Sequence, residues 1–179
     1  MKYIRLLLIS IVVLAVCIAG VTLLLPSNVK VSRAANLYIG SDSVLTNISD
    51  LSKWKNWYPG FDTLELTGTE SRNGKVISAL VKNVRLRIIT DTDSLVTVEM
   101  KKGVQPVYNN WRLIRYAASD SLTLQNYMDF HFKWYPWERF SGLLLDRSYG
   151  ATMEKGLRNL KELYRNTAGI DGSPVTTGN

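Results

Sequence analysis

The chain has 179 residues, a formal net charge of +7 and a hydrophobic share of 46%. Its apolar residues are unevenly distributed, because residues 6–25 form a run of 20 residues without a charge. A helix of this length spans about 30 Å, which is about the hydrocarbon thickness of a bilayer. These features exclude a soluble cytosolic protein, a multi-span transporter and a disordered chain.

Residues 1–27 are interpreted as a single-pass membrane anchor that is not removed. A secretory signal has an apolar region of about 7 to 15 residues followed by small residues at its cleavage site, whereas this longer run ends in Leu25 and Pro26. Lipidation of Cys17 is a second, less favoured interpretation, because the bulky Val16 stands where a lipoprotein processing site has a small residue.

The charges indicate the orientation of the anchor and the surroundings of the domain. Lys2 and Arg5 precede the apolar run, and a short basic N-terminus usually stays in the cytoplasm. We therefore expect residues 6–25 to cross the inner (cytoplasmic) membrane once, with the soluble domain on the periplasmic side. The other basic residues are scattered, which favours a solvated surface near anionic headgroups over nucleic-acid binding.

Turn signals and hydrophobic periodicity divide residues 28–166 into the elements of one domain. A first strand is predicted over residues 29–38, followed by a short helix and by a helical turn that contains two tryptophans. The dipeptide Asn73-Gly74 predicts a tight two-residue hairpin, and spacing of about ten residues favours an antiparallel meander. The further strands are predicted at residues 64–71, 75–82, 84–90, 95–101, 107–116 and 122–134.

The last strand and the helix after it have the clearest patterns. A period of two over residues 122–134 places apolar side chains on one face, with Asn126 among them. Helical spacing over residues 140–165 predicts a long amphipathic helix, which must lay its apolar stripe on the sheet. Residues 167–179 are rich in Gly, Ser and Thr and are expected to form a disordered tail.

Two motifs point to a known family. Asp50 begins a stretch of the form D-x-x-x-W-x-x-W-x-P that ends at Pro59, and residues 153–161 read M-E-K-G-L-R-N-L-K. With V-S-R at residues 31–33, residues 28–166 resemble the SRPBCC superfamily, also described as START-like or Bet v 1-like. The similarity is greatest to its bacterial polyketide cyclase/dehydrase-type branch, whose final helix has the form F-E-K-G-L-x-x-L-K.

The resemblance implies an α+β helix-grip fold. In this fold a curved antiparallel sheet of six to seven strands wraps around the long C-terminal helix, with two short helices after the first strand; here one transmembrane helix precedes it. An apolar cavity is expected between the sheet and the helix. The residues expected to line it are Trp54, Trp57, Tyr58, Leu124, Asn126, Met128, Phe130, Phe132, Trp134, Met153 and Leu157.

Two of these assignments have structural alternatives. The aromatic side chains Trp54, Trp57 and Tyr58 can plug the core instead of lining the cavity entrance. Asn126, if buried, needs a hydrogen-bond partner, and a backbone group or a water competes with a ligand carbonyl or hydroxyl for that role.

No residue pattern indicates catalysis. His131 is the only histidine and falls on the polar face of the last strand, and the acidic residues fall mostly in turns. Because Cys17 is the only cysteine, neither an intrachain disulfide nor a zinc cluster can form. We therefore expect no catalytic residue, no cofactor and no metal.

The leading hypothesis is a membrane-anchored domain that binds an apolar or lipid-like small molecule. One alternative is an enzyme of the polyketide cyclase/dehydratase type, which a raised pKa on a carboxyl or tyrosine facing the cavity would favour. The other is a membrane-surface adaptor without a ligand, which a filled cavity and an exposed apolar patch would favour. The sequence leaves the ligand and the oligomeric state open.

Overall fold

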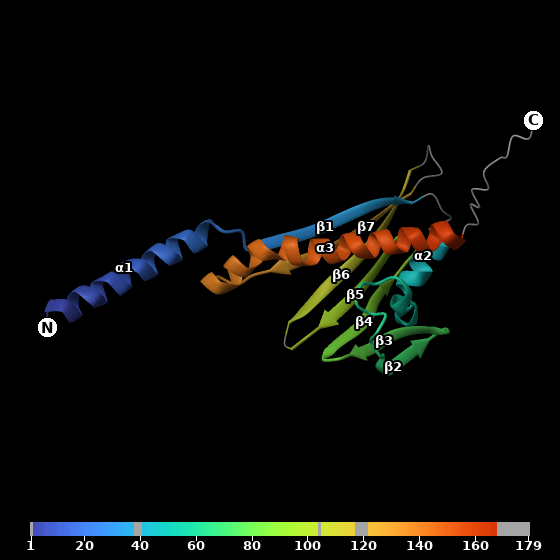
Figure 1. The fold of residues 1–179 in the computed structure, drawn as a ribbon, viewed down its shortest axis with the longest axis horizontal. Coiled ribbons are helices and arrows are strands. Elements are labelled where there is room, and N and C mark those ends of the chain that lie inside the picture. Colours follow the sequence, from blue (N-terminus) through green and yellow to red (C-terminus); the bar gives the residue numbers. More distant parts are fainter. Residues whose placement is uncertain (1, 38–40, 104, 117–121, 168–179) are drawn as a thin grey trace, which may run out of the picture.

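A computed structural model describes residues 2–37, 41–103, 105–116 and 122–167. The chain begins with helix α1 (Lys2–Leu24) and ends with the long helix α3 (Pro136–Thr167), and a seven-stranded sheet lies between them in sequence. The short helices α2 (Ser41–Ile48) and η1 (Leu51–Asn56) follow the first strand. Figure 1 shows α3 lying along the sheet, so the predicted α+β helix-grip fold is confirmed.

All neighbouring strands of the sheet are antiparallel, in the order β1-β7-β6-β5-β4-β3-β2. The first and last strands lie side by side, with Asn28 opposite His131 and Leu37 opposite Leu122. The strands are β1 (Asn28–Leu37), β2 (Thr67–Arg72), β3 (Lys75–Val81), β4 (Val84–Asp91), β5 (Leu95–Lys101), β6 (Pro106–Arg115) and β7 (Leu122–His131).

Local sequence explains the best-defined turn. Asn73 and Gly74 connect β2 to β3 with φ angles of 52° and 76°, and a two-residue hairpin that matches strand twist needs positive φ at both positions. The predicted hairpin is therefore confirmed. In contrast, β2 begins at Thr67, three residues later than residue 64, because Leu64 belongs to the irregular segment that follows η1.

The last strand ends earlier than predicted and α3 begins earlier. After His131 the chain leaves the strand, and the amide of Phe132 donates to the carbonyl of Ser27. Pro136 is then the first helical residue, a position that suits proline because the first amide of a helix needs no partner. Glu138 stabilises this start by accepting a 2.8 Å hydrogen bond from the amide of Lys133. Of the predicted tail, residues 168–179 lie outside the described residues.

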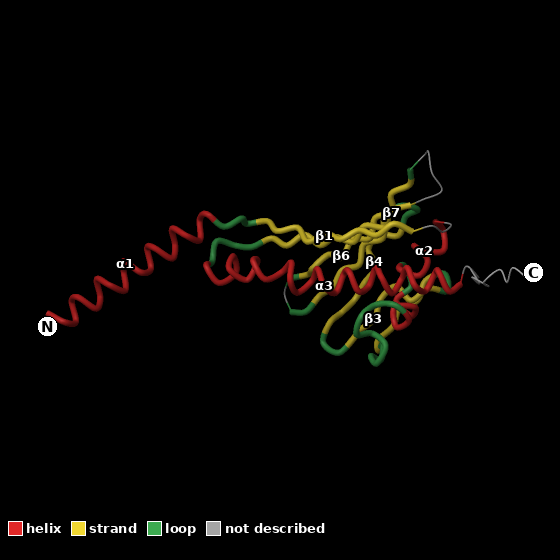
Figure 2. The backbone as a smooth tube through the Cα atoms, turned by 45° about the horizontal axis from the view of Figure 1, so that its top comes forward, coloured by secondary structure: helices red, strands yellow, loops and turns green. Residues whose placement is uncertain are grey.

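The core lies between the sheet and α3 and continues under α2 and η1. Three tryptophans, Trp54, Trp57 and Trp111, are its largest fully buried side chains. A smaller cluster around Val31, Met128 and Met153 lies towards the end where α3 begins. The tube view in Figure 2 shows α2 at the opposite end of α3 from α1.

Helix α1 extends away from the domain at the end where α3 begins (Figure 1). Its 23 residues have a mean hydropathy of 3.0 over their most apolar window, so the helix is long and apolar enough to cross a membrane. Most of its apolar side chains are exposed, and Thr22 is the buried exception among its described residues. Thr22 therefore marks the point where α1 meets the domain.

Candidate functional site

The site is built on the turn that begins with η1. The Asp50 carboxylate caps η1 by accepting from the amide of Ser52 at 3.1 Å, and it also accepts from the amide of Val76 in β3 at 3.2 Å. A side-chain oxygen at a helix start satisfies an amide that otherwise lacks a partner. One carboxylate therefore starts η1 and fastens it to the sheet.

An aromatic cluster forms from the residues of this turn. Tyr58 stacks on Trp54 with ring centroids 4.5 Å apart, and Phe61 meets Tyr58 edge-on at 5.0 Å. Trp57 packs edge-on against Trp111 of β6 at 5.3 Å. The Trp54 indole donates to the carbonyl of Ile48 at 2.9 Å, so this ring is buried with its polar atom satisfied.

Helix α3 packs directly on the same turn. A Cβ atom added at Gly156 would lie 3.4 Å from Cδ of Pro59, an ordinary van der Waals distance, so the turn and the helix are in direct contact here. The Asn159 amide donates to the carbonyl of Trp57 at 2.9 Å. The two motifs that carry the family resemblance therefore contact each other in the fold.

An apolar pocket of about 390 Å³ lies beside the aromatic cluster. Its walls come from the segment after η1 and from β3, β4 and β5, and none of the described residues of α3 lines it. Buried Val81 and Leu86 form its floor. The complete lining is Tyr58, Phe61, Leu64, Val81, Lys82, Asn83, Val84, Leu86, Met100 and Lys102.

The sequence prediction placed the cavity between the sheet and α3, so the pocket lies elsewhere. Trp54, Trp57, Leu124 and Leu157 belong to one buried cluster in the space where the cavity was expected. The indole rings of Trp54 and Trp57 fill the space between the concave face of the sheet and α3. The pocket lies instead beside the aromatic cluster. Tyr58 is the residue that the prediction and the pocket lining share.

The mouth of the pocket carries positive charge. The exposed Lys82, Asn83 and Lys102 lie at the β3–β4 turn and just beyond β5. Because the strands are antiparallel, these connections lie at the same end of the strands as the start of β1 and the end of β7. Helix α1 extends from this same end of the sheet.

Tyr58 brings a phenol to the pocket wall. Burial raises the pKa of Tyr58 well above its ordinary value, and Tyr149 of α3 adds a smaller electrostatic contribution. Its hydroxyl forms no hydrogen bond with any of the described residues. Because the phenol stays protonated at neutral pH, it can donate a hydrogen bond to a bound molecule.

The other predicted cavity residues are distributed over the core and the part of α3 that is nearest to α1. Leu124, Met128, Met153 and Leu157 are buried in the packing between sheet and helix. Three more lie progressively closer to α1: Phe130 meets Tyr149 at 5.0 Å, Phe132 packs against Gly142, and Trp134 is exposed.

Asn126 is buried, and its partner is another side chain. Its amide donates to Oδ1 of Asn109 on β6 at 2.9 Å, so neither a backbone group nor a ligand takes that position. Three buried atoms nearby, Asn126 Oδ1, Asn109 Nδ2 and Trp111 Nε1, have no partner among the described residues. Trp111 and Asn126 are opposite each other in the β6–β7 register, so polar atoms interrupt the apolar interior at this level.

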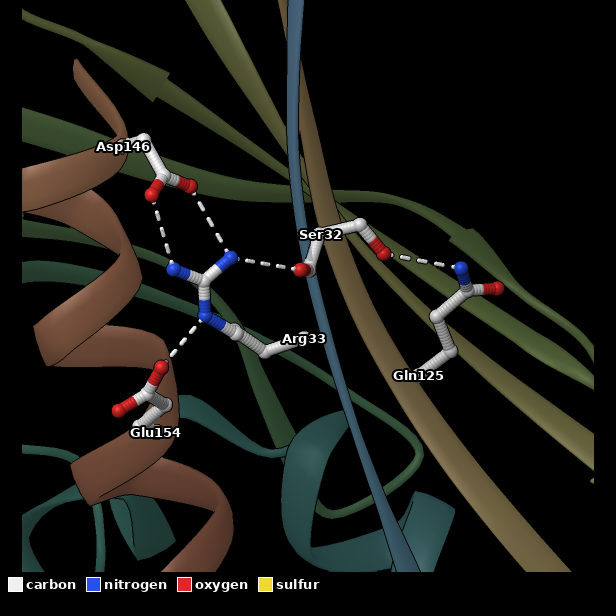
Figure 3. Close-up of polar contacts among 5 residues, drawn as sticks. All are labelled: Ser32, Arg33, Gln125, Asp146 and Glu154. Carbon is white, nitrogen blue, oxygen red and sulfur yellow. Dashed lines mark hydrogen bonds and ion pairs between the residues drawn. The ribbon is translucent and has the colours of Figure 1, made fainter.

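Arg33 joins the sheet to α3 halfway along the helix. Its guanidinium binds both carboxylate oxygens of Asp146, at 3.0 and 3.1 Å, and Oε1 of Glu154 at 2.6 Å (Figure 3). These bonds hold the pKa of Arg33 above and the pKa of Asp146 below their ordinary values. On the other side of β1, Gln125 donates to Ser32, which holds β1 on β7 beside the ion pair.

Sequence reasoning missed most of the pocket walls. Val81, Val84, Leu86 and Met100 belong to strands whose alternation is recognisable in the sequence, but the strongest pattern lies in β7, and the pocket lies on the same face of the sheet at β3–β5. Positive φ at Lys82 shows the tight β3–β4 turn that brings Val81 and Val84 together. Among the described residues, no group of three or more His, Cys, Asp or Glu could hold a metal ion.

No protein-family model matches the sequence, and no curated protein matches it. Solved structures nevertheless share its architecture. A START-superfamily protein from Mycobacterium smegmatis has a TM-score of 0.56 at 14% identity, covering 77% of this chain and 98% of its own. Norcoclaurine synthase from Thalictrum flavum, a point mutant in complex with a transition-state analogue, has a TM-score of 0.57 at 17% identity, covering 79% and 96%.

The di-domain ARO/CYC protein StfQ of the steffimycin biosynthetic pathway has a TM-score of 0.57 at 13% identity. The match covers 80% of this chain and 52% of StfQ. At these identities the likeness establishes the fold alone. The sheet order, the long C-terminal helix and these neighbours together show that residues 28–167 adopt the START-like helix-grip fold.

Proposed function

We propose that this chain is a membrane-anchored domain that binds an apolar small molecule with an acidic end, such as a fatty acid. The observation that carries the proposal is the apolar pocket of about 390 Å³ with lysines at its mouth. Small-molecule sites are concave, mostly apolar and about 300 to 1,000 Å³ in volume, with few polar groups that orient the ligand. The Thalictrum flavum structure, which holds a small molecule in the same fold, supports the proposal.

The pocket suits an amphiphile because its apolar and polar parts are separated. Phe61, Leu64 and Leu86 offer apolar contacts to a hydrocarbon chain. Lys82 and Lys102 at the mouth can pair with a carboxylate or phosphate that remains in water. A ligand bound in this way exchanges its apolar surface for protein contacts while its charge stays hydrated.

The membrane anchor is the second part of the proposal. Helix α1 has the length and hydropathy of a membrane span, and Lys2 and Arg5 at its start favour the cytoplasmic side for the N-terminus. In this proposal the domain lies on the periplasmic face of the inner membrane. The end of the sheet that bears the pocket mouth then lies towards the bilayer, from which an apolar ligand can be taken up.

A cyclase or dehydratase role receives no comparable support. Tyr58 faces the pocket with a raised pKa, but a general acid or base works best with a pKa near the working pH. Burial moves the pKa of Tyr58 away from that range, so the phenol is suited to binding and not to proton transfer. The open pocket likewise favours ligand binding over an adaptor with a filled cavity.

Photo-crosslinking tests the proposal and locates the ligand. The full chain is reconstituted in phosphatidylcholine vesicles with a fatty acid that carries a diazirine in its acyl chain, and labelled peptides are identified by mass spectrometry. We expect labels in residues 58–64, 81–86 and 100–102. Labelling of α1 alone would contradict the binding proposal, because any acyl chain in the bilayer reaches that helix.

A matched pair of variants separates pocket occupancy from general effects. Val84→Trp places a large ring at the pocket wall, whereas Ile89→Trp places the same ring on an exposed position of the same strand. We expect Val84→Trp to abolish labelling of the pocket peptides and Ile89→Trp to retain it. Near-ultraviolet circular dichroism confirms that both variants are folded.

A further inference from the structure

An exposed apolar patch covers the start of α3 and the turn before it. Trp134 and Trp137 are each 68% exposed and Leu144 is 66% exposed. We call the whole set the membrane-proximal patch, and it consists of Trp134, Tyr135, Trp137, Phe140, Leu143 and Leu144. Apolar groups of this size that remain exposed together mark an interaction site.

The patch is continuous and well ordered in its geometry. Tyr135 stands 4.9 Å from both Trp134 and Trp137, so the three rings form one block. At about 100° per residue, Trp137, Phe140, Leu143 and Leu144 fall within about 120° of the helix circumference. The patch is therefore one face of α3, preceded by the aromatic block.

Hydrogen bonds place the patch at the end of α1. Arg139, on the first turns of α3, donates to the carbonyls of Thr22 at 3.1 Å and Leu25 at 2.7 Å. Thr22 is buried although its helix is otherwise exposed. The start of α3 therefore overlaps the last turn of α1, at the point where the 20-residue uncharged run ends.

We propose that the membrane-proximal patch inserts into the interface between lipid headgroups and acyl chains, as a second membrane contact beside α1. The inference rests on the proposed anchoring of α1, since that anchoring sets the depth of the patch. Tryptophan and tyrosine are enriched at this depth because their rings are apolar and their N–H and O–H groups are polar. Interfacial helices bury their apolar face about 5–10 Å deep, and the eight residues from Trp137 to Leu144 extend about 10 Å along the helix axis.

A second contact fixes the orientation of the domain as well as its distance from the bilayer. One helix alone allows the domain to tilt about the end of α1. With the patch inserted, the end of β7 and the start of β1 are held at the surface, because Phe132 is bonded to Ser27. The end of the sheet that carries Lys82 and Lys102 then stays oriented towards the membrane.

Tryptophan fluorescence tests this placement in the full chain. Of its five tryptophans, Trp54, Trp57 and Trp111 are buried in the core, and only the two in the patch are exposed. The chain is reconstituted in phosphatidylcholine–phosphatidylglycerol vesicles that contain lipids brominated near the headgroup end or deep in the acyl chain. We expect the shallow bromines to quench emission more than the deep ones, and we expect quenching to disappear in the Trp134→Phe/Trp137→Phe variant.

The other outcomes show which part of the proposal is wrong. A chain that floats with the vesicles but shows no quenching contradicts the second membrane contact and leaves the anchor intact. A chain that does not float contradicts the anchor and the inference together. If instead Leu144→Cys, in a Cys17→Ser background, is cross-linked to a second copy by a bis-maleimide without quenching, the patch is a contact between two chains and the inference is wrong.

Discussion

The guanidinium of Arg33 in β1 lies directly against Gly150 of α3 at the interface between sheet and helix. A Cβ atom added at Gly150 would lie 2.5 Å from Nη2 of Arg33, too close for both to remain in place. Asp146 and Glu154, one turn before and one turn after Gly150, bind the same guanidinium. The absence of a side chain at Gly150 therefore creates the space in which the ion pairs form.

This relationship predicts that Gly150→Ala has opposite effects in two backgrounds. In the natural chain the new methyl group displaces the guanidinium and weakens its bonds to Asp146 and Glu154. In an Arg33→Met background no bonds are lost, and alanine stabilises the helix by up to about 1 kcal/mol over glycine. Thermal unfolding of the four chains in lipid nanodiscs measures the difference, and equal effects of Gly150→Ala in both backgrounds would contradict the steric relationship.

The same ion pair predicts part of the dependence of stability on pH. In the folded chain Arg33 holds the pKa of Asp146 below its ordinary value. The ordinary pKa of an unperturbed aspartate is about 3.9. The stabilisation is therefore complete above that value and is lost as the pH falls through the lowered pKa. Asp146→Asn removes this loss, so its unfolding temperature changes less than that of the natural chain between about pH 5 and pH 2.

A control for this prediction is Asp62→Asn, which makes the same chemical change on an exposed residue outside the interface. It should keep the pH dependence of the natural chain. A pH profile of Asp146→Asn that coincides with that of the natural chain would show that the pair contributes nothing to stability.

The buried asparagines predict that a double substitution is milder than a single one. Asn126→Leu removes the partner of Asn109 and leaves a buried amide without a hydrogen bond, which costs about 1–3 kcal/mol. Adding Asn109→Leu removes the unsatisfied group, so the double variant should be more stable than the single variant. Denaturant unfolding measures this order, and strictly additive losses would show that the two amides do not depend on each other.

The lysines at the pocket mouth predict selectivity for acidic ligands. Exposed ion pairs contribute about 0.2–1 kcal/mol each, so Lys82→Gln/Lys102→Gln should weaken binding of a fatty acid by up to about thirtyfold. Binding of the corresponding fatty alcohol should be unchanged. Lys55→Gln, on the exposed side of η1, is the control, and equal weakening for the acid and the alcohol would exclude a role for charge.

The order of elements could be predicted because each element carries its own local signal. Asn73 and Gly74 specify a hairpin, the period of two specifies β7, and the stripe through Met153 and Leu157 specifies α3. The ends of elements were less predictable because contacts distant in sequence determine them. The bond from Phe132 to Ser27, for example, takes the chain out of β7 after His131.

The pocket could not be located from sequence for a different physical reason. An apolar strand face shows that something covers it, but not whether the covering leaves a void. Here Trp57, Trp111 and Leu157 fill the concave face. The pocket results from how far the segment containing Phe61 and Leu64 stands from β3–β5, a distance that no local pattern encodes.

The pairing of β1 with β7 has a consequence for how the protein is made. β1 directly follows α1, yet its partner in the sheet is the last strand, and Asn28 and His131 are separated by more than half of the chain. A growing chain therefore holds β1 with an unpaired edge until β7 has been synthesised. Such long-range pairing forms slowly, and an unpaired edge is prone to association with other chains. The nascent domain completes its sheet late, so premature contact with neighbouring chains is its main folding hazard.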